Sequence, residues 1–283
     1  MTDPSLGEFL RAELRRLAED VCGQETGVRG EHRDVHAMRV ACRRLRALLQ
    51  SAEGVITDPR AAGLRDELRW LGSELGRARD AEVFRSRVDD LLGAGAAPDG
   101  ITRVLDLDAQ AGRAAALLAL DSARWAALRA RLGEVGQLTL DAELASLPVE
   151  AGMGHLVDRQ SKRLRKARRR ARHTEAQSLD RALHAVRKRA KAVRYAAEVA
   201  APVLGHRAER LAERAEYIQD VLGQHQDAVV ARDRLRRLAV EADVDPEAAF
   251  ALGTVAAEEE RRGEAAREAY RRVTTKLPKH VRD

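Results

Sequence analysis

The sequence predicts an all-α protein, and three observations carry that prediction. Apolar residues recur at intervals of three and four along most of the chain, Ala and Leu are abundant, and no stretch alternates with period two for long. Of the 283 residues, 45% are hydrophobic, 34% are charged and 3% are aromatic. That length and hydrophobic fraction allow one large domain or two modest ones with a real core, and the composition is not that of a disordered chain.

The first half reads as a series of helices. Ser5 and Glu8 form a capping-box pattern that opens a helix to about Cys22, and a Gly-rich turn follows it. A second helix is expected over residues 31–52, and Pro59 begins a long third helix that contains Gly76. A loop over residues 93–100 and further helices over residues 101–132 complete this half.

The second half repeats this organisation after a linker at residues 133–154. We expect Pro202 and Gly205 to stop the second helix of this half, and a turn near Pro246 to precede the last helix. The expected helices span residues 155–173, 179–200, 206–240 and 246–275.

Two motifs recur at a nearly constant offset. His36-Ala-Met-Arg39 returns as His184-Ala-Val-Arg187, 148 residues later, and Leu75-Gly76 followed by Asp80 returns as Leu222-Gly223 followed by Asp227, 147 residues later. This predicts an internal duplication: two pseudo-symmetric four-helix bundles, residues 1–140 and 141–283, that together form one domain and face each other across a pseudo-twofold axis.

Positive charge is concentrated in one stretch. Lys and Arg outnumber Asp and Glu by 51 to 45, a net charge of +6. Residues 155–194 contain fifteen Arg or Lys and three acids, so the rest of the chain is net acidic. Because 45 of the 51 cations are Arg in a chain rich in Ala and Gly, the position of the charge is the evidence, and the Arg-to-Lys ratio is not.

Two of the expected helices carry a column of cations beside the buried stripe. Each column follows the three-four spacing one residue after the apolar positions, which rotates it about 100° from the core side. Like charges at this spacing repel by a few tenths of a kcal/mol per pair, so an anionic ligand or acids from other helices must offset them. The columns are Arg33, His36, Arg39, Arg43 and Arg46, and Arg181, His184, Arg187, Lys191 and Arg194.

Two interpretations of these columns stay open. Charged helix faces are commonly solvated and paired with acids of neighbouring helices, and Asp80 and Asp227 are candidates for orienting an Arg or His in each half. The other interpretation is an anion-binding surface. A metal site at His36 and His184 is disfavoured, because the neighbouring arginines would repel a divalent cation.

The sequence carries no catalytic motif. We find no Gly-rich phosphate loop after a strand, no nucleophile placed with a base, and no carboxylate cluster for Mg²⁺, and we expect no cofactor. Cys22 and Cys42 are expected to be reduced and structural. Few aromatics are available for base stacking, which disfavours single-stranded nucleic acid and leaves duplex binding open. No uncharged run exceeds ten residues and no leader pattern opens the sequence, so we expect a cytoplasmic protein without a membrane span.

The recurring motifs resemble the CHAD family of conserved histidine α-helical domains over residues 5–275. The resemblance implies paired four-helix bundles around a basic cavity, non-catalytic binding of inorganic polyphosphate, and association with polyphosphate granules. The alternatives are a regulator or subunit of a polyphosphate- or triphosphate-metabolising enzyme, and a duplex nucleic-acid binder. The motifs are Val35-His-Ala-Met-Arg-Val-Ala-Cys-Arg-Arg-Leu-Arg46, Leu75-Gly-Arg-Ala-Arg-Asp80, Leu183-His-Ala-Val-Arg187 and Leu222-Gly-Gln-His-Gln-Asp227.

The same resemblance implies a set of phosphate-contacting residues. In the first half they are His36, Arg39, Arg43, Arg44 and Arg46, and in the second half His184, Arg187, Lys191 and Arg194. Charge and spacing add Lys188 and, on the preceding helix, Arg159, Arg163, Lys166 and Arg170. Arg79, Asp80 and Asp227 are expected to support the site, although Gln226 stands where the first motif has Arg79.

Overall fold

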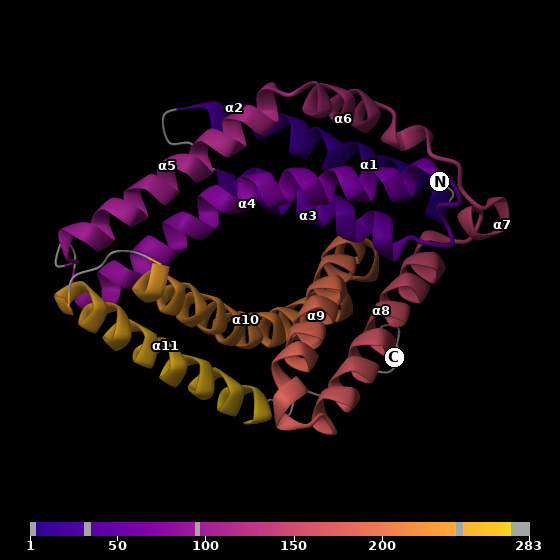
Figure 1. Ribbon diagram of the computed structural model, residues 1–283. Coiled ribbons are helices and arrows are strands. Elements are labelled where there is room, and N and C mark those ends of the chain that lie inside the picture. Colours follow the sequence, from indigo (N-terminus) through magenta and orange to yellow (C-terminus); the bar gives the residue numbers. More distant parts are fainter. Residues whose placement is uncertain (1–3, 31–34, 94–96, 242–245, 273–283) are drawn as a thin grey trace.

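The computed structural model describes residues 4–30, 35–93, 97–241 and 246–272, and these contain helices, turns and isolated bridges but no β-strand. In the first half, long helices pack side by side, and α6 lies across the outer face beside α1 (Figure 1). The helices are α1 (Leu6–Gly23), α2 (Glu25–Arg29), α3 (Val35–Ser51), α4 (Arg60–Leu92), α5 (Asp99–Asp121) and α6 (Ala123–Gly133).

The second half consists of two long helical pairs below the first half in Figure 1. A short connection of a 3₁₀ turn, η1 (Val135–Gln137), and α7 (Ala142–Ala145) leads into it. The helices are α8 (Val149–Arg172), α9 (Ala176–Leu204), α10 (His206–Glu241) and α11 (Pro246–Arg272).

Three helix ends predicted from local sequence signals are confirmed. The Ser5 side chain accepts from the backbone N–H of Glu8 while the Glu8 carboxylate accepts from the backbone N–H of Ser5, which is the predicted capping box. Pro59 is the N-cap of α4, and Gly205 ends α9 with φ 59°, a value that favours glycine.

Three boundaries differ from the predictions. The expected Gly-rich turn after Cys22 contains the short helix α2, and the linker ends at Pro148 because α8 begins at Val149. Pro202 lies inside α9 and does not stop it, since the helix continues to Leu204. Arg33 and the predicted ends at residues 31 and 275 lie outside the described residues.

Both halves contribute to each of two hydrophobic cores. The larger core runs from the α1 leucines through α3 and α4 to α9 and the start of α10. The smaller core, at the far ends of α4 and α10, joins Phe84 and Val88 to Leu235 and Leu252. Beside it Glu259, fully buried, pairs with Arg87 of α4 and with Arg262. The halves are therefore fixed against each other, and residues on α3 and α9 keep a defined relative position.

Candidate anion-binding site

Helices α3 and α9 pack against each other and set the position of the candidate site. Met38, Cys42 and Leu45 of α3 and Val186 and Ala190 of α9 are buried in the same core. The predicted cationic columns stand beside these buried stripes, so packing of the stripes places the two columns next to each other. The columns therefore meet at the contact between the two halves.

Five cations form what we call the central cluster: Arg39, Arg43, Arg46, Arg187 and Lys191. Burial, and then the four guanidinium groups of the cluster, lower the pKa of Lys191 from its ordinary value to about 7. Burial likewise lowers the pKa of Arg46. Positive charges are thus held together at a cost that an anionic ligand would reduce.

Two buried donors of the central cluster lack a partner among the described residues. The Nε atoms of Arg43 and Arg187 are buried and have no hydrogen-bond partner among the described residues. Within that part of the chain, Arg39 is the one cluster residue with an ion pair within 4.0 Å, and its partner is Asp80. No such pair is formed by Arg43, Arg46, Arg187 or Lys191. A buried donor without a partner costs about 1–3 kcal/mol. An anion with several oxygens would remove that cost.

Two glycines make room for two of the arginines. The Arg39 guanidinium lies against Gly76 of α4, where a Cβ would stand 3.4 Å from Nη2, and the Arg187 guanidinium lies against Gly223 of α10, 3.6 Å from a Cβ there. Both distances are ordinary van der Waals contact, so an alanine methyl would fit there, whereas a longer side chain would meet the guanidinium. The glycine of each Leu-Gly motif therefore contacts an arginine at the equivalent position of its half, Arg39 in the first and Arg187 in the second.

The predicted supporting acids behave differently. Asp80 pairs with Arg39 at 3.3 Å, and Arg39 also donates to the Gly76 carbonyl at 3.5 Å. Asp227 is exposed, and no ion pair with Arg187 is recorded. Arg79 pairs with Glu82 at 3.4 Å, while Gln226, which takes the place of Arg79 in the second motif, lies 2.9 Å from Nδ1 of His184.

Two predicted contact residues are held by acids outside the cluster. Arg194 lies 2.7 Å from Glu198 and 2.8 Å from Glu216, and Arg44 lies 3.8 Å from the same Glu198. Acids therefore offset part of the positive charge at this end of the helices, as the interpretation of paired helix faces expects. His36 and His184 of the columns are exposed, and so is Lys188, which charge and spacing added.

Most of the predicted residues of α8 line a separate basic groove. The groove has a volume of about 780 Å³ and lies between α8, α9 and the end of α3. Glu53 is the only acid that the described residues contribute to its lining. Its cations are Arg163, Lys166, Arg170, Arg181 and Arg189. Arg159, the other predicted residue of α8, does not line the groove and donates a hydrogen bond to the Ser51 carbonyl.

The groove and the central cluster lie on opposite flanks of α9. With 100° per residue, Ala185 and Arg189 stand about 90° to one side of the buried stripe, and Arg187 and Lys191 about 100° to the other. Arg181 was predicted in the column of His184 but faces the groove. Arg189 was missed, although the small residues Ala182 and Ala185 on its face were a signal of an open groove.

Other site chemistries receive no support from the described residues. They contain no group of three or more His, Cys, Asp or Glu side chains that could hold a metal ion. Cys22 and Cys42 are free thiols, and burial raises the pKa of Cys42 to about 12. Within the described residues, none of the helices combines the length and the apolar character needed to cross a membrane.

The comparisons with known proteins identify the family. The model of the CHAD domain matches residues 12–236, and the chain belongs to this family. Two relatives in Mycobacterium tuberculosis, the uncharacterized proteins MT2285 (strain CDC 1551 / Oshkosh) and Rv2226 (strain ATCC 25618 / H37Rv), are each 34% identical over 264 residues. The match covers 88% of this chain and 48% of each relative, so the chain spans about half the length of the curated relatives it matches.

Two solved structures share the fold. The CHAD domain from the plant Ricinus communis has a TM-score of 0.73 and 28% identity, with 98% of this chain and 94% of that chain covered. PptA from Streptomyces chartreusis has a TM-score of 0.78 and 23% identity, with 94% and 98% covered. The all-α architecture is thereby confirmed, while the internal duplication stays a prediction that the parallel seats of Arg39 and Arg187 support.

Proposed function

We propose that the chain binds inorganic polyphosphate without cleaving it, through the central cluster between its two halves. The single observation that carries this proposal is the group of five cations from α3 and α9, in which two buried guanidinium Nε atoms have no partner among the described residues. Cations that repel one another and lack acids gain most from a ligand with closely spaced negative charges.

A linear phosphate chain suits this arrangement better than other anions. Successive cations on one helix face stand about 5–6 Å apart, which lets neighbouring phosphates of one chain meet neighbouring side chains. Arginines donate two parallel hydrogen bonds to phosphate oxygens, and recognition needs no reading of bases. The basic groove, on the other flank of α9, offers a second stretch of cations along which the same chain can continue.

Competition between long-chain polyphosphate and duplex DNA tests the proposal. At about 150 mM salt, the protein is expected to prefer polyphosphate, and the affinity is expected to fall steeply as salt rises, because binding releases counterions. The variant Arg43→Gln/Lys191→Gln removes two cluster charges and is expected to lose most of the affinity. A matched control, Arg103→Gln/Arg210→Gln, removes two exposed charges on α5 and α10 and is expected to keep it.

The outcomes separate the alternatives. Equal affinity for duplex DNA, or equal losses in the two double variants, would overturn the proposal in favour of general attraction between a basic surface and a polyanion. Incubation of the protein with polyphosphate and Mg²⁺, followed by sizing of the polymer, addresses catalysis. The proposal expects unchanged chain length, and shortening would favour an enzyme.

A further inference from the structure

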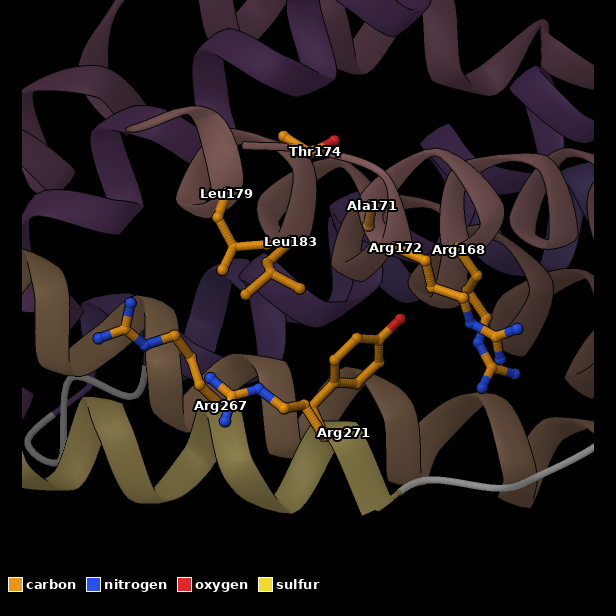
Figure 2. A pocket seen from close by; sticks show the side chains of 9 residues that line it. Arg168, Ala171, Arg172, Thr174, Leu179, Leu183, Arg267 and Arg271 are labelled. Atoms are coloured by element: carbon orange, nitrogen blue, oxygen red, sulfur yellow. The ribbon is translucent and has the colours of Figure 1, made fainter. Parts of the chain in front are cut away.

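A second kind of pocket lies where the end of α11 meets the turn between α8 and α9 (Figures 1 and 2). Its volume is about 350 Å³, toward the small end of the range of roughly 300–1,000 Å³ seen for ligand sites. It shares no lining residue with the central cluster. Figure 2 shows Arg168 and Arg172 reaching in from α8, Leu179 and Leu183 from α9, and Arg267 and Arg271 from α11.

One wall of this pocket is apolar, which distinguishes it from the central cluster and the basic groove. Leu183 and Ala171 are buried and Leu179 is half-buried, and the ring of Tyr270 completes the wall. Burial raises the pKa of Tyr270, and a hydrogen bond links its hydroxyl to Arg168, so the ring presents a neutral, oriented face. Polyphosphate has no apolar part and gains nothing from such a wall.

The rim of the pocket is strongly basic. Four arginines and no acid belong to its lining among the described residues. Two of these are partly balanced, since Arg271 lies 2.6 Å from Glu268 and Arg267 lies 4.0 Å from Asp180. Arg172 is exposed and makes no recorded ion pair within the described part of the chain, so its guanidinium is available to an anion.

We propose that this pocket binds an organic anion that joins one compact apolar group, the size of one or two aromatic rings, to a single phosphate, sulfonate or carboxylate. The apolar group lies against Leu179, Leu183 and Tyr270, and the anionic group meets Arg172 at the rim. Thr174 supplies the one uncharged polar side chain besides the Tyr270 hydroxyl within the described lining. Recognition therefore depends on shape and charge, without a set of groups that would read the edge of a nucleobase.

Thr174 also lines the basic groove, but the pocket shares no lining residue with the central cluster that the polyphosphate proposal rests on. Titration calorimetry of the full chain tests the pocket. The probe is naphthyl phosphate at about 150 mM salt, and the controls are inorganic phosphate and naphthol, which carry the charge and the apolar group separately. We expect one naphthyl phosphate per chain, and at least about tenfold weaker binding of either control, because each lacks one half of the recognition. Equal binding of inorganic phosphate, or no binding of the probe, overturns the proposal.

Variants locate the binding. Arg172→Glu at the rim and Leu179→Asn on the wall are each expected to weaken naphthyl phosphate binding at least about tenfold. Arg169→Glu, an exposed neighbour on α8 outside the pocket lining, makes the same charge change as Arg172→Glu and is expected to leave it unchanged. Polyphosphate binding is expected to persist in the Leu179→Asn variant. Displacement of the probe by polyphosphate, or equal losses in the Arg169 and Arg172 variants, contradicts a separate site.

Discussion

The two halves of the molecule each place an arginine at an equivalent position of the central cluster, but the two arginines differ in their partners. Arg39 in the first half is tethered, with Asp80 at 3.3 Å and the Gly76 carbonyl at 3.5 Å as acceptors. Arg187 in the second half rests on Gly223 in the same manner, yet its buried Nε has no partner among the described residues. One arginine is thus already partly neutralised in the free protein, and the other keeps its full capacity for a ligand.

A second difference concerns the next position in each column. Arg43 in the first half is matched by Lys191 in the second, 148 residues later. A guanidinium stays charged at any accessible pH, whereas burial and the neighbouring arginines lower the pKa of Lys191 to about 7. At these two positions the first half therefore has a tethered arginine and a second arginine that stays charged, whereas the second half has an untethered arginine and a titratable lysine. We expect the second half to respond more strongly to a bound anion.

Removal of the untethered arginine is expected to have the largest effect. Arg187→Gln should weaken polyphosphate binding by about 1.5–3 kcal/mol, roughly 10- to 150-fold, because a charge-assisted hydrogen bond is lost and no acid of the described residues had offset that charge. Arg39→Gln should cost about 0.2–1 kcal/mol less, since Asp80 already neutralises part of the Arg39 charge. Binding isotherms of the two variants, with circular dichroism to confirm equal helix content, make the comparison.

Each variant controls for the other, because both remove one guanidinium that lies over a glycine of the neighbouring helix. Equal losses of affinity in the two variants would mean that the ion pair with Asp80 does not weaken the contribution of Arg39 to polyphosphate binding. A larger loss for Arg39→Gln would contradict the proposed asymmetry.

The titration of Lys191 is expected to give the next largest effect. Bound phosphates favour the ammonium form and raise the pKa of Lys191, so at pH values above 7 binding takes up a proton. Polyphosphate affinity should then fall as pH rises from 7.5 to 8.5, by at most about tenfold. Calorimetry in buffers of different ionisation enthalpy measures the proton uptake, with long chains so that titration of the end phosphates is negligible.

The Lys191→Arg variant should bind with little pH dependence over the same range, because an arginine at this position stays charged. Stability of the free protein should respond in the opposite direction. The unfolded chain, in which Lys191 regains its ordinary pKa, binds more protons between pH 7 and 10, so this residue makes the folded state more stable as pH rises. A pH dependence of affinity that survives in Lys191→Arg would assign it to another group.

Removing the acid that pairs with Arg39 should raise polyphosphate affinity, by less than the preceding changes lower it. Asp80→Asn removes the acid beside Arg39, and because Asp80 is 74% exposed the pair is worth only about 0.2–1 kcal/mol. Polyphosphate should therefore bind about 1.5- to 5-fold more tightly. Asp227→Asn changes the net charge equally, but no pair between Asp227 and Arg187 is recorded, so a smaller gain is expected. Equal gains of affinity in the two variants would mean that the change in net charge, and not the loss of the pair with Arg39, causes the tighter binding.

The sequence was sufficient for much of this picture because helix periodicity and capping are local. The Ser5 capping box, the start of α4 after Pro59 and the stripe of Met38 and Cys42 were all predicted from neighbouring residues. The pairing of α3 with α9 brings together positions about 148 apart, and motif repetition suggested it without giving the contact.

What the sequence could not give depends on long-range side-chain geometry. Glu216 of α10 pairs with Arg194 of α9 across two helices, whereas Glu198 is a local partner four residues along α9 that the sequence could have shown. Arg181 and Arg189 face the groove beside α8, which depends on how α8 and α9 pack. The continuation of α9 through Pro202 was missed for a similar reason. A proline signal is local, whereas the packing of Ala200 and Leu204 that accompanies the continued helix is tertiary.

The smallest expected effect concerns His184, the counterpart of His36. Oε1 of Gln226 lies 2.9 Å from Nδ1 of His184, and because an amide oxygen accepts hydrogen bonds, this contact favours the ring form that carries a proton on Nδ1. Gln226→Leu removes that acceptor. Because His184 is exposed, water replaces the lost bond at little cost, and polyphosphate affinity should fall by about 0.5 kcal/mol, roughly twofold. Nitrogen NMR of the ring should show the Nδ1–H form lost in this variant even where affinity hardly changes. An unchanged tautomer would mean that Gln226 does not orient the ring, and a loss above about tenfold would place Gln226 itself in contact with the phosphate chain.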